Sequence, residues 1–284
     1  MTSLLRVKKV GVFASLQDRG RYGYRAYGVP CSGPMDRASF HFGNEILSNE
    51  ANAVALELFI GGFSFEALTT QSYVLTGAPG ICSVNGEVLQ QWATFTLKEG
   101  DVLSVQTTIS GAIVYLCTAG GFETTSVLGS KSAYFPAGIG EEINDGTILF
   151  GECSTRLQNK RGLYHTYLPS FTERNVRVYK GVHFDLFSQE SINAFFTDDY
   201  QFTGGNRMGY YFNGNKLALK APKEILSEAT QFGTIQVPAS GQPIVLMADA
   251  QTVGGYPIIA TVHPDDLRLV AQLKMYEKIR FVPI

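Results

Sequence analysis

The stretch Tyr73-Val-Leu-Thr-Gly-Ala-Pro-Gly-Ile-Cys-Ser-Val-Asn-Gly86 decides the class of fold. It holds two short apolar runs, and the second run ends at Asn85-Gly86, a dipeptide typical of tight hairpin turns. Short runs rich in β-branched and aromatic residues, bounded by turn residues, are typical of strands. The stretch therefore predicts strands joined by short turns.

The same pattern extends on both sides of this stretch. Short strand-like runs recur from residue 53 to residue 151, and a second set begins at Val176. The more polar segment 152–175 reads as a link between two domains. With 284 residues and 30 glycines, the chain is long enough for two cores and rich in turns. We expect a mainly β protein with a first domain over residues 1–165 and a second over residues 166–284.

One amphipathic helix is expected near the start of the first domain, over residues 35–47. Ala38, Phe42 and Ile46 are spaced by four residues and would share one face of it. Ser32 can cap this helix, with Pro34 near its first turn, where a missing N–H does no harm.

The bulk composition excludes several classes of protein. The chain has 23 Lys and Arg against 25 Asp and Glu, a net charge of −2, so a nucleic-acid or membrane-surface protein is not expected. It has no run of about eighteen apolar residues and no secretory signal, which favours a cytoplasmic location. Its four cysteines are far apart in the sequence, which favours free thiols over disulfides or a metal site: Cys31, Cys82, Cys117 and Cys153.

A buried strand over 243–247 leads into the polar stretch Met247-Ala-Asp-Ala-Gln-Thr-Val-Gly-Gly-Tyr-Pro257. An acid, an amide, a hydroxyl and a glycine pair at a strand end suit a binding site, because glycines let a ligand or another backbone approach closely. The alternative is a tight turn whose polar side chains cap local amides. The candidate residues here are Asp249, Gln251, Thr252, Gly254, Gly255 and Tyr256.

Arginines in two glycine-flanked loops form a second group of candidates. Arg21 lies in the loop 17–23 together with Asp18, and Arg207 lies on the turn 204–209. A guanidinium fork suits planar binding of a carboxylate or phosphate. The alternative for the first loop is an internal Asp–Arg pair that fixes a turn.

The segment Gly129-Ser-Lys-Ser132 resembles a phosphate-binding loop without being one. Such a loop needs Gly directly before the Lys and another Gly five residues upstream, and these positions hold Ser130 and Thr125. No dinucleotide fingerprint or His-Glu-x-x-His pattern occurs in the sequence, and no metal site is expected.

Six motifs in a fixed order resemble the biotin-dependent carboxyltransferase family, also called allophanate hydrolase subunit 2. They span nearly the whole chain: residues 17–23, 28–36, 127–132, 207–209, 233–238 and 249–257. Where the family usually has Gly-Ser-Arg-Ser, this chain has Lys131, which keeps the charge and loses the two-pronged geometry.

The resemblance implies two cyclophilin-like β-barrel domains. It also implies a complex with a sister subunit of similar fold and with a third, lactam-opening subunit. Together they would open the lactam of 5-oxoproline to glutamate with ATP. The position of the ATP site is not implied, and no bound biotin is expected because no biotin-carrying Met-Lys motif is present. Two other roles remain open: a regulatory protein that antagonises an inhibitor of a sporulation histidine kinase, and a biotin-dependent carboxyltransferase acting on a urea-type substrate.

Opening a lactam needs cations for the anionic groups, a carboxylate base for water and donors that orient the substrate. As a hypothesis, Arg21 and Arg207 bind anions, while Asp18 and Asp249 act as base or orient these arginines. Replacing Arg207 or Asp249 with Ala is then expected to abolish turnover with little loss of thermal stability. The substrate would be positioned by Ser32, Gln236, Gln251, Thr252, Gly254, Gly255 and Tyr256.

Overall fold

A computed structural model of the chain describes residues 1–153 and 172–284. Within these residues the chain forms two compact units, residues 1–21 with 32–153 and residues 22–31 with 172–284. The expected domain boundary at 165/166 lies outside the described residues, as does most of the polar link. Residues 22–31, which include the 3-10 turn Arg25–Tyr27, group with the second unit.

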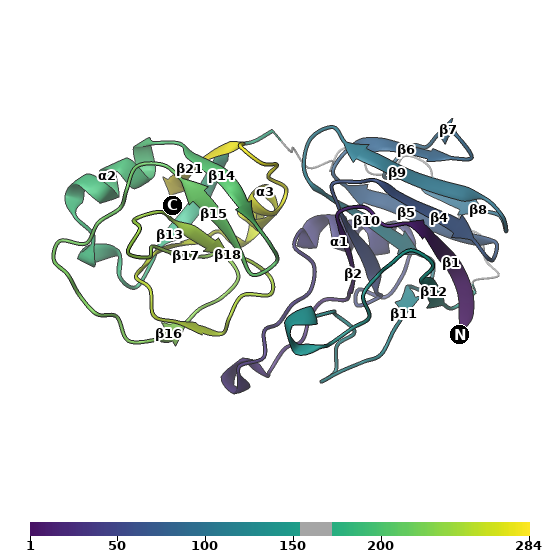
Figure 1. Ribbon diagram of the computed structural model, residues 1–284, viewed down its shortest axis with the longest axis horizontal. Coiled ribbons are helices and arrows are strands. Elements are labelled where there is room, and N and C mark those ends of the chain that lie inside the picture. The colour runs from purple at the N-terminus through teal and green to yellow at the C-terminus, as the bar shows by residue number, and fades with distance from the viewer. Residues whose placement is uncertain (154–171) are drawn as a thin grey trace. The chain divides into compact units, whose positions relative to one another are not determined.

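The first unit consists of two antiparallel sheets, so the described residues confirm the mainly β expectation. The seven-stranded sheet has the order β11-β12-β1-β4-β9-β6-β7, and the five-stranded sheet has the order β2-β3-β10-β5-β8 (Figure 1). The strands are β1 (Thr2–Lys9), β2 (Phe13–Gln17), β3 (Ala55–Phe59), β4 (Phe63–Ala67), β5 (Gln71–Gly77), β6 (Gly80–Val84), β7 (Glu87–Val88), β8 (Thr94–Leu97), β9 (Val102–Thr108), β10 (Ile113–Thr118), β11 (Phe122–Glu123) and β12 (Ile148–Gly151). Asn85 and Gly86 join β6 to β7 with positive φ at both residues, as the hairpin turn requires.

One apolar core lies between the two sheets of the first unit. Leu56 of β3 and Leu116 of β10 come from one sheet, while Phe65 of β4 and Leu103 of β9 come from the other. All four are fully buried. Because side chains alternate along a strand, the opposite face of the five-stranded sheet is left for the helix.

The helix α1 (Arg37–Ile46) packs on this opposite face, against β5 and β10. Its N-cap is Asp36, whose side chain accepts a hydrogen bond from the Ser39 amide at 3.0 Å, and not Ser32 as the sequence predicts. An aspartate that directly precedes the first helical turn is the better cap because its carboxylate reaches the free N–H groups. The predicted helix is confirmed, with its start two residues later.

Glu57 is buried on the same face, in an otherwise apolar strand. Its carboxylate accepts hydrogen bonds from the Met35 amide at 2.9 Å and from the Tyr115 hydroxyl at 2.5 Å. Burial, followed by the charge of Glu57, raises the pKa of the Tyr115 phenol well above its ordinary value. The carboxylate thereby ties the start of α1 to the sheet.

The second unit is built on a closed barrel of seven strands in the order β13-β20-β17-β18-β15-β14-β21 (Figure 1). A separate two-stranded ribbon, β16–β19, carries part of the glycine-rich stretch. The elements are β13 (Asn175–Lys180), α2 (Gln189–Thr197), β14 (Tyr200–Gly205), β15 (Gly209–Asn213), β16 (Glu228–Ala229), β17 (Thr234–Gln236), β18 (Ile244–Leu246), β19 (Val253–Gly254), β20 (Ile258–Val262), α3 (Leu267–Ala271) and β21 (Lys278–Pro283).

Aromatic side chains fill the core of the barrel unit. Phe195 of α2 stacks on Phe281 of β21 with ring centroids 4.8 Å apart, and Tyr200 and Phe212 pack against the same ring. Within the described residues, no helix is long and apolar enough to cross a membrane.

Candidate functional site

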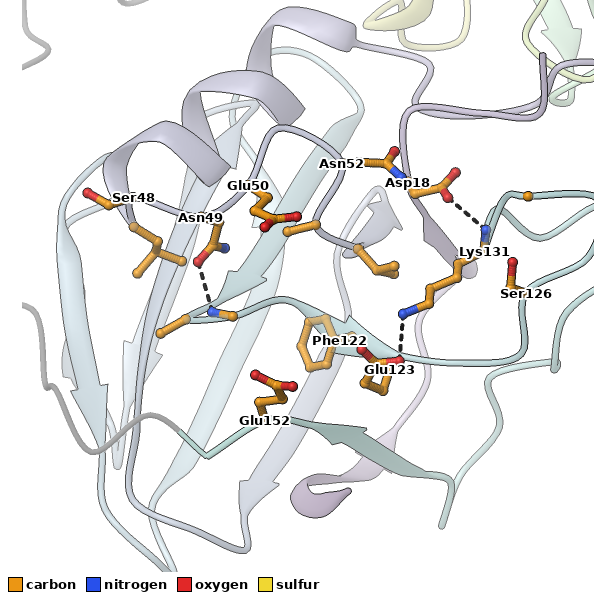
Figure 2. Close-up of a pocket in the computed structure, with 16 residues that line it drawn as sticks. Asp18, Ser48, Asn49, Glu50, Asn52, Phe122, Glu123, Ser126, Lys131 and Glu152 are labelled. Atoms are coloured by element: carbon orange, nitrogen blue, oxygen red, sulfur yellow. Dashed lines mark hydrogen bonds and ion pairs between the residues drawn. The ribbon is translucent and has the colours of Figure 1, made fainter.

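A polar cleft with a volume of about 540 Å³ lies in the first unit (Figure 2). Its walls come from the turn after α1, from β11 with the loop before it, and from the loop that carries the Gly-Ser-Lys-Ser segment. Charged and amide side chains face it from these elements: Asp18, Asn49, Glu50, Asn52, Glu123, Lys131 and Glu152.

Asp18 is fixed at the end of β2 by a ring of donors. Its Oδ1 accepts hydrogen bonds from the hydroxyls of Ser130 at 2.6 Å and Ser132 at 2.7 Å, and from the Gly20 amide at 2.9 Å. Its Oδ2 accepts one from the Lys131 amide at 2.7 Å. The structure thus joins the loop 17–23 to the Gly-Ser-Lys-Ser segment, which lies far from it in the sequence.

These contacts decide the charge of Asp18. Burial alone would raise the pKa of its carboxyl, but the hydrogen bonds from Ser130, Lys131, Ser132 and Gly20 outweigh burial and hold the pKa below its ordinary value. A carboxylate with a lowered pKa and four donors is a weak proton acceptor at neutral pH. The geometry therefore favours a positioning role for Asp18.

The stability that Asp18 provides should depend on pH. Because its pKa is lowered in the folded state, its contribution is present above the ordinary Asp pKa of about 3.9 and is lost as the pH falls through the lowered value. Urea unfolding of the wild type and Asp18→Asn across this range should show a difference in unfolding free energy that is constant near neutrality and shrinks in acid. A difference that stays the same in acid would contradict this assignment.

Among the described residues that line the cleft, Lys131 is the one cation. Its Nζ lies 2.6 Å from the Glu123 carboxylate, and Figure 2 shows this pair next to Asp18. Glu50 and Glu152 also line the cleft. Carboxylates therefore outnumber cations among the described lining residues.

Arg21 is almost fully buried beside this cluster. Its Nε donates to the Val127 carbonyl and its Nη2 to the Ser132 carbonyl, each at 2.9 Å. These two bonds hold both ends of the loop that carries Lys131. The anion-binding role expected for Arg21 stays a prediction, because these contacts serve to fix the loop.

Ser32 lies in the first unit with a buried hydroxyl. Its φ is 55°, a left-handed backbone conformation that is uncommon for residues other than glycine. Within the described residues its Oγ has no hydrogen-bond partner.

In the barrel unit, Arg207 and Asp249 form a buried ion pair. Nε and Nη2 of Arg207 donate to the two carboxylate oxygens of Asp249 at 2.8 Å and 2.9 Å, and both side chains are 7% exposed. The Asp249 amide also donates to the Arg207 carbonyl at 2.7 Å. The pair joins the turn between β14 and β15 to the stretch after β18. Because the pair is buried, removing either partner should lower stability more than the little loss expected from the sequence.

The stretch after β18 also contacts Gln236 of β17 and Thr230, which precedes that strand. Nε2 of Gln251 donates to Oε1 of Gln236 at 3.4 Å, a long hydrogen bond. The Thr230 hydroxyl donates to the Gln251 carbonyl at 2.6 Å, and the Thr230 amide donates to the Thr252 carbonyl. Gln236 and Thr252 are buried, whereas Gln251 is half-buried.

Gly254 and Gly255 differ in how much room surrounds them. A Cβ on Gly254 would lie 2.5 Å from Nε2 of Gln236, whereas the nearest atoms to a Cβ on Gly255 would be 3.6 Å away. Tyr256 is half exposed. The structure therefore brings Gln236, Gln251 and Gly254 together in the barrel unit, and it places Asp18, Arg21 and Ser32 in the first unit.

Sequence reasoning missed three residues that hold Asp18 and Lys131 in place at the cleft. Ser130 and Ser132 bind Asp18, and Glu123 binds Lys131. A signal for two of them was present, because the Gly-Ser-Lys-Ser segment places both serines beside Lys131 in a glycine-rich loop.

This loop does not fit a triphosphate. Its hydroxyls and the Lys131 amide are bound by Asp18, its ammonium by Glu123, and further carboxylates line the same cleft. Phosphate binding needs free donors and positive potential. Within the described ranges there is also no group of three or more His, Cys, Asp or Glu side chains that could hold a metal ion.

Residues 27–283 match the family described as carboxyltransferase domain, subdomain A and B. The chain is 33% identical over 273 residues to the C subunit of 5-oxoprolinase from Haemophilus influenzae, covering 94% of this chain and 87% of that protein. It is 32% identical over 285 residues to the C subunit of 5-oxoprolinase from Escherichia coli, covering 98% and 91%.

The fold is shared with a solved structure of urea amidolyase from Kluyveromyces lactis, with a TM-score of 0.91 and 28% identity. The likeness covers all of this chain, which spans only 19% of the length of that enzyme. The family match covers residues 27–283, and the two bacterial relatives match this chain over 94% and 98% of its length. The chain therefore belongs to the carboxyltransferase domain family, with both of its subdomains.

Proposed function

We propose that this chain is the C subunit of an ATP-dependent 5-oxoprolinase, which hydrolyses 5-oxo-L-proline to L-glutamate. The observation that supports this most is reciprocal coverage: the chain and the two bacterial proteins named as 5-oxoprolinase C subunits match over most of both lengths. The partners would be a sister subunit of the same superfamily together with the lactam-opening subunit. ATP would be used by the assembled complex, and the position of its site stays open.

Roles for the residues follow from their contacts. Asp249, held by the Arg207 fork, would orient water or substrate at the barrel end, while Gln236 and Gln251 would position the substrate. Asp18 and Arg21 would act as positioning residues that fix the loop bearing Lys131. Ser32, Thr252, Gly254, Gly255 and Tyr256 remain proposed substrate-contacting residues.

A second candidate function is carboxyl transfer to a urea-type substrate. The family description and the likeness to a urea amidolyase favour it. The chain spans only 19% of the length of that larger enzyme, which argues against this candidate. Such chemistry would need biotin on another protein.

Reconstitution tests the main proposal. Phosphate release and glutamate formation from 5-oxoproline and ATP should require this chain together with its sister and lactam-opening subunits. Leaving out this chain should reduce both rates to background. Full activity in its absence would overturn the proposal, and an inactive full set in which this chain still binds its sister tightly would favour the regulatory role.

A further inference from the structure

His183 is bonded to the start of β20 through both its backbone and its side chain. Its amide donates to the Ile258 carbonyl at 3.1 Å, and its Nδ1 accepts a hydrogen bond from the Ile258 amide, also at 3.1 Å. The imidazole is only 11% exposed, and Ile258 is 5% exposed. We call these two buried bonds the His183–Ile258 contact.

The contact lies at an irregularity in the barrel. The register between β17 and β20 shifts at this point, so that two residues of β20 oppose one residue of β17. Such a bulge interrupts the regular ladder of strand hydrogen bonds, and the ring of His183 is the acceptor for the Ile258 amide there. Ile258 directly follows Pro257, the last residue of the stretch after β18. His183 therefore holds the point at which this stretch enters the barrel.

The His183–Ile258 contact fixes where the ring carries its proton. A backbone amide can only donate, so Nδ1 has no proton and the neutral ring carries its one proton on Nε2. Nε2 lies 3.6 Å from Oε1 of Glu228 in β16, which is too long for a hydrogen bond. A proton on Nδ1 would remove the acceptor of the Ile258 amide and place a positive charge beside Glu228.

The charged groups around the ring are few. β20 has no titratable side chain. On the segment that carries His183, Asp185 is exposed and the ammonium of Lys180 lies over an aromatic ring 4.9 Å away. The Lys220 ammonium donates to the Asp185 carbonyl at 2.8 Å. Among the described residues, Glu228 is therefore the charged group within ion-pair distance of His183, and its negative charge attracts the protonated ring.

We propose that His183 is a pH-sensitive switch for this end of the barrel. The neutral ring holds the Ile258 amide. The ring protonated on Nδ1 releases this amide and turns towards Glu228, so the start of β20 opens locally as the pH falls below neutral. An effect on turnover rests on the proposed function, because the residues proposed to contact the substrate lie on the stretch that ends at Pro257, whereas the switch itself does not.

Hydrogen exchange of the full-length chain tests the switch. Protection of each amide is measured relative to its intrinsic exchange rate at about pH 7.5 and about pH 5.5, and protection of the Ile258 amide should fall about tenfold at the lower pH. Val262 is the control in the same strand, because its amide donates at 2.8 Å to the Gly233 carbonyl, an acceptor that does not titrate. Its protection should change less than about twofold.

Matched variants assign the effect to one histidine. His183→Gln offers a carboxamide oxygen that takes up no proton in this range, so protection of Ile258 should no longer depend on pH. His263→Gln is the control, because Nδ1 of His263 also accepts a backbone amide, that of Asp265 at 3.3 Å, and the Ile258 response should remain. Glu228→Gln removes the charge beside the ring and should move the response to lower pH by roughly half a unit.

The ring signals of the wild type cover the case in which His183→Gln does not fold. Nitrogen NMR should show a proton on Nε2 alone at about pH 7.5, and protonation of Nδ1 should accompany the loss of Ile258 protection. A ring that stays neutral across this range, a protonated ring with Ile258 still protected, or a pH response that persists in His183→Gln would overturn the switch. None of these measurements uses substrate, so such a result leaves the proposed function untouched.

Discussion

Replacing Arg207 with Ala is expected to lower the free energy of unfolding by about 3–5 kcal/mol, because it leaves the Asp249 carboxylate buried without its partner. Both hydrogen bonds of the guanidinium fork are lost together, and little solvent can replace them. Urea unfolding followed by circular dichroism measures the effect. Loss of turnover in this variant therefore cannot be interpreted before its stability is known.

Two further variants separate burial from ion pairing. Arg280 and Asp199 form an ion pair at 2.8 Å in the same unit, with both side chains 46% exposed, so Arg280→Ala should lower stability by only about 0–1 kcal/mol. The double replacement Arg207→Met with Asp249→Leu should regain most of the lost stability, because no charge is then left buried. If Arg207→Ala costs no more than Arg280→Ala, water reaches Asp249 and the site is more open than the structure indicates.

Local patterns in the sequence were sufficient for the strands and hairpins. The turn at Asn85-Gly86 and the helix over residues 35–47 follow from neighbouring residues. The predicted helix cap was wrong because Ser32 and Asp36 are both good capping residues, and only the backbone decides between them.

The candidate sites depend on contacts between residues far apart in the chain. Asp18 meets the loop 127–132 across more than a hundred residues, and Arg207 meets Asp249 across 42. No spacing rule relates such positions. The sequence therefore suggested that Asp249 orients an arginine only as one of two roles, and it gave no partner for Asp18 in the loop 127–132. It also could not show that two arginines suited to anions would be buried against carbonyls and a carboxylate.

Replacing Asp18 with Ala should have an effect nearly as large, about 2–4 kcal/mol of unfolding free energy. The change removes the common acceptor of two hydroxyls and of the Gly20 and Lys131 amides. Urea unfolding gives the magnitude. The control is Asp145→Ala, an exposed aspartate whose Oδ1 accepts one hydrogen bond, from the Val10 amide, and whose loss should lower stability by about 1 kcal/mol or less.

Hydrogen exchange distinguishes a local from a global effect of Asp18→Ala. The Lys131 amide donates directly to Asp18, so it should lose protection even under conditions in which the strands of the first unit remain protected. Lys131 would then no longer be held at the cleft beside Glu123. If the variant is as stable as the wild type and the Lys131 amide stays protected, water replaces the carboxylate in the ring of donors. In that case the two bonds from Arg21 to the Val127 and Ser132 carbonyls are sufficient to hold the loop.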